Sequence, residues 1–303
     1  MIYFKPFNLT DYADCLIVTD ERLSSLYEIS GDNVYFLPRG EQAKSFAEVE
    51  KLCKWFLSKN LCKDGKVVSI GGGSVGDTVG FACSVYKRGG IKLTHVPTTL
   101  IAQIDSGIGG KTALDVGSVK NAVGSFYAAD TVIDVNFLKT LDEIQIKSGL
   151  GELFKYRMLS ETIDRLYQGE ITEQVIKACV SFKEGVCATD PYDNNERRIL
   201  NFGHTVGHAV ELVYKLSHGE AVANGLYYET LLAYKLGLCN EEYFNKWSCE
   251  IAKRFKIYSL TEEALNLTLN DKKNADGKIG FSFPRDFKMT YLDLSQIKNL
   301  LLC

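Results

Sequence analysis

The sequence lacks several features that would assign it to a specialised class of protein. Among its 303 residues, 35 Lys and Arg nearly balance 38 Asp and Glu, so the formal net charge is only −3. This balance argues against a protein that binds nucleic acid or a membrane surface. No apolar run approaches the roughly 20 residues that span a bilayer. The N-terminal residues also lack the apolar stretch of a signal peptide, so we expect a cytoplasmic protein.

Cysteine pairs with the spacing of metal or redox motifs are absent, although the chain has nine cysteines. Their number is odd, no Cys-x-x-Cys occurs, and most of them lie in apolar patterns. We therefore expect reduced, buried cysteines that pack as small hydrophobic residues. Internal repeats and low-complexity tracts are absent too. With 46% apolar and 24% charged residues, the composition is that of an ordinary globular protein.

Apolar runs in the first half of the chain have the length and composition of buried parallel strands. These runs lie at residues 12–19, 33–37, 66–70, 91–96 and 131–135. After Leu141 the pattern becomes helical, and a short extended pair and a last helix follow. The helical patterns cover residues 162–188, 201–216, 219–237 and 241–255, and the extended pieces cover 279–283 and 289–292. We predict an α/β Rossmann-like domain at residues 1–140 and a mostly α-helical domain at residues 141–303.

Glycine is concentrated in two segments of the first half. Residues 71–77, GGGSVGD, directly follow an expected strand and precede a helix. Such a turn lets backbone N–H groups approach a phosphate, and the helix dipole favours the anion. The spacing is not G-x-G-x-x-G, so a simple tight connection is the alternative. In the second segment, Lys111 and Lys120 on a glycine-rich loop suit a phosphorylated or carboxylated ligand, although solvated loops also carry lysine.

Histidine is scarce, yet three of the four histidines fall in one short region. His204 and His208 are four residues apart and share a face if the segment is helical, and His218 follows shortly. Imidazole is a common zinc ligand, so spacing alone favours His204 and His208 as a metal-binding pair. Ordinary helix histidines are the alternative. The fourth, His95, lies inside an expected strand and is predicted to be a core residue.

Several motifs in a fixed order carry a family resemblance: GGGSVGDTVGF, VPTTLIAQIDSGIGGKT, KNAVGSFY, SGLGELFKY, LNFGHTVGHAVE, HGEAVANG and DKKN. From about Asp20 to at least Asn274 the chain resembles 3-dehydroquinate synthase, within the sugar-phosphate cyclase superfamily. The resemblance implies a dehydroquinate synthase-like fold and a lyase of the shikimate pathway, in aromatic amino acid biosynthesis. It implies bound NAD, a Zn²⁺ or Co²⁺ ion, and a homodimer.

The resemblance also assigns roles to individual residues. The implied metal ligands are Glu152, His204 and His218, while His208 becomes a proton-transfer residue; this replaces the pair that spacing favours. The implied substrate contacts are Asp105, Lys111, Lys155, Lys183, Arg197, Asn201, His208 and Lys272. The implied cofactor contacts are Asp20, Glu41, Lys44, Gly73, Ser74, Val75, Gly76, Asp77, Thr98, Thr99, Lys111, Lys120, Asn121 and Thr140.

The implied reaction converts 3-deoxy-D-arabino-heptulosonate 7-phosphate to 3-dehydroquinate and phosphate. NAD⁺ takes a hydride, phosphate leaves by β-elimination, the hydride returns, and an intramolecular aldol step closes the carbocycle. The chain departs from the family at three positions. Arg22 replaces an Asn that contacts the adenosine end of NAD, Val119 replaces a Gly before the loop lysine, and Arg157 replaces a common Gly. The N-terminal strand pair is also expected to be reduced.

Three alternatives to this function remain. Another sugar-phosphate cyclase, such as one similar to 2-deoxy-scyllo-inosose synthase, would share the fold and the metal site. A metal-dependent alcohol dehydrogenase of the glycerol dehydrogenase type shares the GGGS turn and the paired histidines. Against it stand five cations that a neutral polyol does not need: Lys111, Lys155, Lys183, Arg197 and Lys272. A non-catalytic sugar-phosphate binding protein would be expected to lose a metal ligand or His208, and neither is lost.

Overall fold

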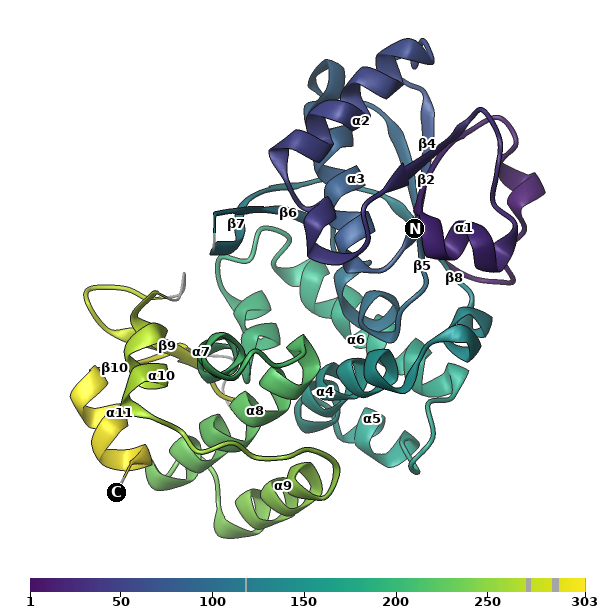
Figure 1. The fold of residues 1–303 in the computed structure, drawn as a ribbon. Helices are drawn as coiled ribbons and strands as arrows, with labels where there is room; N and C mark the ends of the chain where they lie inside the picture. The colour runs from purple at the N-terminus through teal and green to yellow at the C-terminus, as the bar shows by residue number, and fades with distance from the viewer. Residues whose placement is uncertain (118, 271–273, 285–288, 303) are drawn as a thin grey trace. The chain divides into compact units, whose positions relative to one another are not determined.

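The computed structural model describes residues 1–117, 119–270, 274–284 and 289–302 of the chain. These residues form two compact units, Met1–Asp142 and Glu143–Cys303 (Figure 1). Among the described helices, none combines the length and the apolar composition that crossing a membrane requires. Lys272, one of the predicted substrate contacts, lies outside the described residues.

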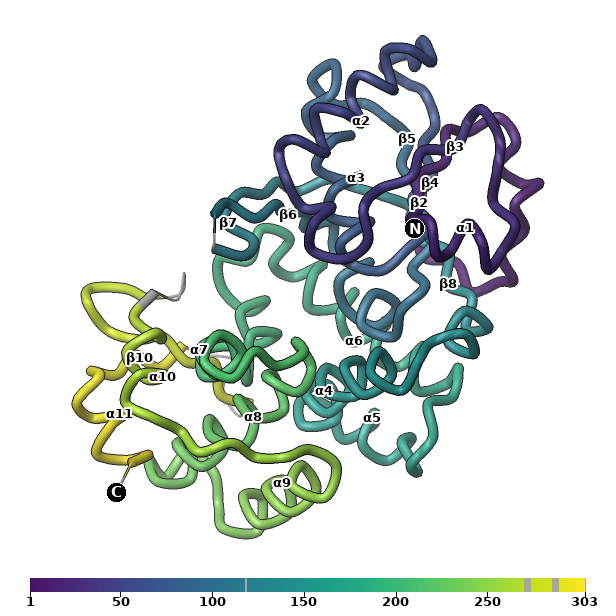
Figure 2. The backbone as a smooth tube through the Cα atoms, viewed as in Figure 1, coloured from purple at the N-terminus to yellow at the C-terminus, as the bar shows by residue number. Residues whose placement is uncertain are grey.

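The first unit is built on a six-stranded sheet in the order β1-β8-β5-β4-β2-β3, in which every neighbouring pair is parallel. The backbone trace in Figure 2 shows β2, β3 and β4 side by side. The five strands predicted from apolar runs are confirmed, whereas β1 was not predicted because it has only three residues, none of them buried. The strands are β1 (Ile2–Phe4), β2 (Leu16–Asp20), β3 (Val34–Leu37), β4 (Lys66–Gly71), β5 (Lys92–Pro97) and β8 (Asp130–Ile133).

Both faces of the central strands β5, β4 and β2 are buried, because residues of each of these strands enter two different cores. Val67 of β4 packs in a core with residues of α2 (Phe46–Ser58) and α3 (Gly73–Val85). Its neighbours Val68 and Ile70 belong to a second core. Successive side chains of a strand point to opposite faces, so a sheet covered on both sides needs apolar residues at every position. The Rossmann-like α/β fold predicted for this part of the chain is confirmed.

The glycine-rich segment after β5 is not the irregular loop that the sequence predicted. It starts in a π-helical turn, Ala102–Ser106, and then forms an antiparallel hairpin of β6 (Lys111–Val116) and β7 (Val119–Phe126). Lys111 therefore begins one strand, and Lys120 lies in the other. Most residues of β7 are exposed, so hydrophobic patterning gave little sign of a strand there.

The second unit is mostly helical, as predicted, and its central element is α8 (His218–Lys235). This helix packs against α4, α7, α9 and α11, while the predicted extended pair forms an antiparallel hairpin.

Two helix predictions were wrong in their bounds. The pattern at 162–188 is broken between residues 166 and 173, and the helix predicted from residue 201 begins at His204 after a 3₁₀ turn, Glu196–Asn201. The other elements are α4 (Glu143–Leu159), α5 (Glu161–Leu166), α6 (Glu173–Thr189), α7 (His204–Tyr214), α9 (Glu241–Arg254), α10 (Glu262–Leu267), β9 (Ile279–Ser282), β10 (Met289–Leu292) and α11 (Leu294–Leu301).

Pairs of glycines let the helices of this unit touch backbone to backbone. A Cβ atom on Gly151 of α4 would lie 2.0 Å from the carbonyl oxygen of Gly219 on α8. A Cβ atom on Gly225 of α8 would lie 1.7 Å from the carbonyl oxygen of Gly203, just before α7. Neither gap admits a side chain, so both contacts require glycine. The first contact brings together α4 and the start of α8, and the second holds the start of α7 against α8.

Arg157 is a buried cation that joins three helices. Its Nε and Nη2 atoms donate to Oδ1 of Asp164 at 3.0 and 2.8 Å, and Nη2 also donates to Oε2 of Glu250 at 3.0 Å. These bonds connect α4 with α5 and α9. The guanidinium also lies 4.6 to 5.2 Å from the centroids of three aromatic rings, those of Phe154, Tyr167 and Trp247.

Candidate metal centre and nucleotide site

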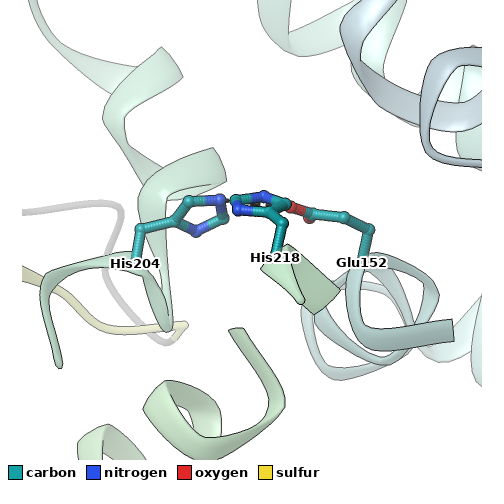
Figure 3. Close-up of side chains that lie close together, drawn as sticks. All are labelled: Glu152, His204 and His218. Carbon is teal, nitrogen blue, oxygen red and sulfur yellow. Dashed lines mark hydrogen bonds and ion pairs between the residues drawn. The ribbon is translucent and has the colours of Figure 1, made fainter. Parts of the chain in front are cut away.

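Glu152, His204 and His218 converge in the second unit, from α4 and from the first residues of α7 and α8 (Figure 3). Nε2 of His218 lies 2.9 Å from Oε1 of Glu152, and Nε2 of His204 lies 3.2 Å from the same oxygen. One potential ligand atom from each residue falls within 4.8 Å of the others. The structure thus brings together the three residues that the resemblance names as ligands, and metal binding itself stays a prediction.

The second nitrogen of each imidazole shows how these rings are oriented. Nδ1 of His204 lies 3.2 Å from the carbonyl oxygen of Phe202, and Nδ1 of His218 lies 3.4 Å from Oε2 of Glu211. A ring that donates its Nδ1–H to such an acceptor presents a lone pair on Nε2. Once Nε2 of each ring has lost its proton, two lone pairs and a carboxylate face one another, and a cation between them relieves their repulsion. Two imidazoles and one carboxylate also leave open coordination positions, as catalytic zinc requires, so the residues fit a divalent metal.

Burial and neighbouring charges set the protonation of this cluster, in which Glu152 is ionised and His218 has a proton to give up to a metal. Glu152 and Lys155 are almost fully buried, and Nζ of Lys155 lies 2.6 Å from Oε2 of Glu152. Burial alone would raise the pKa of Glu152, but Lys155 and His204 outweigh it and hold that pKa well below its usual value. Burial lowers the pKa of His204. Burial opposes protonation of His218 as well, but hydrogen bonds to Glu152 and Glu211 raise its pKa to about 9, and a bound cation would displace that proton.

His208 lies beside the cluster without joining it. Its ring centroid is 5.4 Å from that of His204 and 6.2 Å from that of His218, and the side chain is exposed. The pair favoured by spacing alone, His204 and His208, is therefore not the set whose ligand atoms converge.

Sequence reasoning also missed Glu211, whose carboxylate lies beside Nδ1 of His218. Its position seven residues after His204, on the same face of α7, was the signal that could have revealed it.

The start of α7 is capped by a residue of another helix. Gly203 has a positive φ of 81° and offers no capping side chain, so the first N–H groups of α7 need an acceptor from elsewhere. Glu229 of α8 is fully buried, and its two carboxylate oxygens accept from the N–H groups of Gly203 at 2.8 Å and Val206 at 2.9 Å. Glu229 thereby fixes the backbone on which His204 stands.

Two further predicted substrate residues are buried cations on neighbouring elements. Lys183 lies on α6, which packs against the 196–201 turn that carries Arg197 and Asn201. Nη1 of Arg197 donates to the carbonyl oxygen of Pro191 at 2.8 Å. The carboxylate of Asp190 accepts the backbone N–H of Arg197 at 3.2 Å, together with two other N–H groups of this loop. Buried cations held in this way suit an anionic ligand.

In the first unit the glycine-rich turn borders a small hollow that is open to solvent. The strand β4 ends at Gly71 and α3 begins at Gly73, with no side chain capping the helix, so its first N–H groups are available to an anion. The side chain of Val75 is buried beneath Gly71, so only its backbone can contribute to a ligand site. Residues that line the hollow include Gly72, Gly73, Gly76, His95, Pro97 and Ser106.

Three of the predicted cofactor residues form one polar cluster around Lys44. Nζ of Lys44, which is buried, lies 2.8 Å from Oδ2 of Asp77 and also bonds the side-chain oxygen of Asn121. Asp115, which sequence reasoning missed, lies 4.0 Å from Lys44 and accepts the backbone N–H of Asn121 at 2.7 Å. No spacing rule connects these residues, because the hairpin of β6 and β7 brings them to α3.

Most of the remaining cofactor predictions lie at, or in the turns after, the carboxyl ends of the sheet's strands. Asp20 ends β2, and its carboxylate accepts the N–H of Leu23 at 3.0 Å, which caps α1 (Glu21–Tyr27). Arg22 donates to the carbonyl oxygen of Thr140 at 3.1 Å. The hydroxyl of Ser74 donates to the carboxylate of Glu41 at 3.1 Å, and the hydroxyl oxygen of Thr99 accepts the backbone N–H of Ala102 at 3.2 Å. Ligands of open α/β sheets bind at these carboxyl ends.

His95 is a core residue, as predicted, and we expect it to make the first unit sensitive to acid. Its ring bonds the hydroxyl of Ser69, and burial lowers its pKa to about 4. Below pH 6.5 His95 becomes protonated in the unfolded chain, whereas in the folded unit it stays neutral until about pH 4. Stability is therefore lost as pH falls through that window, by up to about 1.4 kcal/mol per pH unit.

His95→Gln removes this titration while keeping a polar group for Ser69. Between pH 7.5 and pH 5 the wild type should lose about 2 kcal/mol more of its free energy of unfolding than the variant. Urea unfolding followed by fluorescence of Trp55, in a Trp247→Phe background, reports on the first unit. Identical losses in both proteins would contradict a neutral, buried His95.

Comparisons with known proteins cover nearly the whole chain. Two family models match it: 3-dehydroquinate synthase N-terminal over residues 34–148, and 3-dehydroquinate synthase C-terminal over residues 146–274. A curated 3-dehydroquinate synthase from Alkaliphilus metalliredigens is 37% identical over 300 residues, covering 89% of this chain and 83% of that protein.

Two solved structures share the fold. A 2-deoxy-scyllo-inosose synthase complexed with carbaglucose-6-phosphate, NAD⁺ and Co²⁺ has a TM-score of 0.84 at 24% identity, covering 99% of this chain and 95% of its own. ValA, a 2-epi-5-epi-valiolone synthase from Streptomyces hygroscopicus subsp. jinggangensis with NAD⁺ and Zn²⁺ bound, has a TM-score of 0.82 at 26% identity, covering 100% and 95%.

Proposed function

The chain belongs to the 3-dehydroquinate synthase family, and we propose that it converts 3-deoxy-D-arabino-heptulosonate 7-phosphate to 3-dehydroquinate and inorganic phosphate. Family membership makes it an enzyme, a cyclase. The proposal adds that this cyclase is a phosphate-eliminating lyase that depends on NAD and on a divalent metal, Zn²⁺ or Co²⁺. It also includes the homodimer implied by the resemblance, a nucleotide-binding role for residues 1–140 and a metal- and substrate-binding role for residues 141–303.

The observation that carries this proposal is the convergence of Glu152, His204 and His218 beside the buried Lys155. A bound divalent ion would polarise a substrate oxygen there, while NAD would carry the hydride away and back. Lys155 places a positive charge next to the ion site, at a position that is buried from water. Such a charge suits a substrate whose carboxylate or phosphate must enter a buried centre.

Other side chains of the second unit would transfer a proton and bind the anionic groups of the substrate. His208 is exposed, and it stands one helical turn from His204, so it can exchange a proton with a substrate bound at the cluster. Arg197 and Lys183 supply buried positive charge for an anionic group of the substrate. Asp190 holds the backbone of Arg197, and the carbonyl oxygen of Pro191 holds its guanidinium, so less ordering is needed when the substrate binds.

The experiment that tests this function follows the phosphate and the hydride together. We expect one inorganic phosphate for each heptulosonate 7-phosphate consumed, with NAD⁺ needed only in catalytic amounts and no accumulation of NADH. The product should be a cyclic ketone that a dehydroquinate dehydratase converts to an ultraviolet-absorbing enone. Phosphate release from glucose 6-phosphate or sedoheptulose 7-phosphate alone would indicate another cyclase. Stoichiometric NADH from glycerol, with no phosphate released, would indicate a dehydrogenase.

A further inference from the structure

Ser106 carries a buried hydroxyl that lacks a hydrogen-bond partner among the described residues. It is the last residue of the π-helical turn Ala102–Ser106, which follows β5. The neighbouring serines of the same unit are satisfied. Ser69 bonds His95, Ser74 donates to Glu41, and Ser84 donates to the carbonyl oxygen of Phe81. A buried hydroxyl without a partner costs free energy, so its retention calls for a specific explanation.

The hydroxyl lies directly over the first residue of α3. A Cβ atom on Gly73 would be 2.9 Å from Oγ of Ser106, so the absence of a side chain at Gly73 keeps the space before the hydroxyl open. Ser106 and Gly73 line the same hollow, together with Gly72 and Gly76. The start of α3 has no capping side chain, and its N–H groups are donors as well.

The hydroxyl of Ser106 and the first N–H groups of α3 are therefore donors that lack an acceptor among the described residues. Backbone N–H groups at a helix start, the positive end of the helix dipole and a hydroxyl donor all favour an anion with several oxygens. The lining within reach offers glycine backbone and no carboxylate, so nothing there repels a negative charge. A phosphate group meets all of these requirements.

We propose that the hydroxyl of Ser106 donates a hydrogen bond to a pyrophosphate oxygen of the bound dinucleotide. This inference rests on the proposed function, because it takes NAD as the ligand of the first unit. The hydrogen bond gives the hydroxyl its partner only when the cofactor is present. The free-energy cost of the unpaired hydroxyl in the ligand-free protein is then recovered on binding, which makes Ser106 a determinant of cofactor affinity and not of folding.

Ser106→Ala tests this directly. The variant should bind NAD⁺ about 10- to 100-fold more weakly in isothermal titration calorimetry, because a hydrogen bond to a charged group is lost. ADP-ribose, which keeps the pyrophosphate and lacks the nicotinamide, should lose affinity by the same factor. The ligand-free melting temperature should stay equal or rise, because the change removes an unpaired buried hydroxyl.

Ser84→Ala is the matched control on α3, since the hydroxyl of Ser84 donates to Phe81 and accepts from Ser125. That variant should melt at a lower temperature and bind NAD⁺ with unchanged affinity. Unchanged NAD⁺ affinity in Ser106→Ala, or a loss seen with NAD⁺ but not with ADP-ribose, would overturn the phosphate contact while leaving the proposed function intact. Failure of the wild type to bind NAD⁺ would overturn both.

Discussion

His218→Ala should release the metal ion and abolish turnover, whereas His208→Ala should keep the ion and lose about 10²- to 10⁴-fold in kcat. The two histidines differ in geometry. Nε2 of His218 lies 2.9 Å from Oε1 of Glu152, and His208 stands outside the group of converging ligand atoms. Removing a ligand empties the site, while removing a proton-transfer group leaves it assembled. Metal content after dialysis, measured by inductively coupled plasma mass spectrometry, and phosphate release at saturating substrate separate the two effects.

The matched control for this dissection is His204→Ala, which should behave like His218→Ala. Chelation of the wild type should abolish activity as well, and added Zn²⁺ or Co²⁺ should restore it. The opposite pattern, with the ion lost from His208→Ala and kept in His218→Ala, would show that the ligand set is wrong. It would favour His204 and His208, the pair that helical spacing suggests, as ligands.

Arg157→Leu should cost the second unit about 3 kcal/mol of its free energy of unfolding. Removing one member of a buried ion pair typically costs about 3–5 kcal/mol. The lower end applies here, because Asp164 keeps its ion pair with Lys246 and because Glu250 is partly exposed. Urea unfolding followed by Trp247 fluorescence, in a Trp55→Phe background, reports this unit.

Lys246→Ala provides the comparison for Arg157, because it removes the other cation that contacts Asp164. Lys246 is about half exposed, and exposed pairs contribute less than about 1 kcal/mol. If both variants lose the same stability, the buried position of Arg157 is not what makes it important. The expected difference follows from the surroundings of Arg157, which is enclosed by aromatic rings and bonded by two carboxylates.

Much of the fold could be predicted, because the parallel strands are buried on both faces and therefore read as continuous apolar runs. The same reasoning explains what was missed. The strand β1 is only three residues long, and β7 is largely exposed, so neither leaves a hydrophobic pattern. The break between α5 and α6 was missed because residues 167–172 hold a buried Tyr167, which keeps an apolar residue within a connection.

The candidate site was predictable only through the ordered family motifs. Spacing finds neighbours on one helix, so it favours His204 and His208 and cannot reach Glu152, which is contributed by another helix. Glu211 could have been found from its helical position. Asp115 and Ser106 could not, because the importance of each depends on which groups the fold places around it.

The glycine contacts between α4, α7 and α8 have a consequence for the exchange of the metal. A structural zinc site depends on its ion for folding, so its ion leaves only as the chain unfolds. In this protein, backbone contacts at Gly151–Gly219 and Gly203–Gly225 bring together the three helices that carry Glu152, His204 and His218. We therefore expect the three side chains to keep their positions when an ion leaves, so that a new ion has to shed water but does not have to order the chain. We expect such a centre to exchange one divalent ion for another on the timescale of ligand exchange, so that the ion it binds depends on the metals available around it.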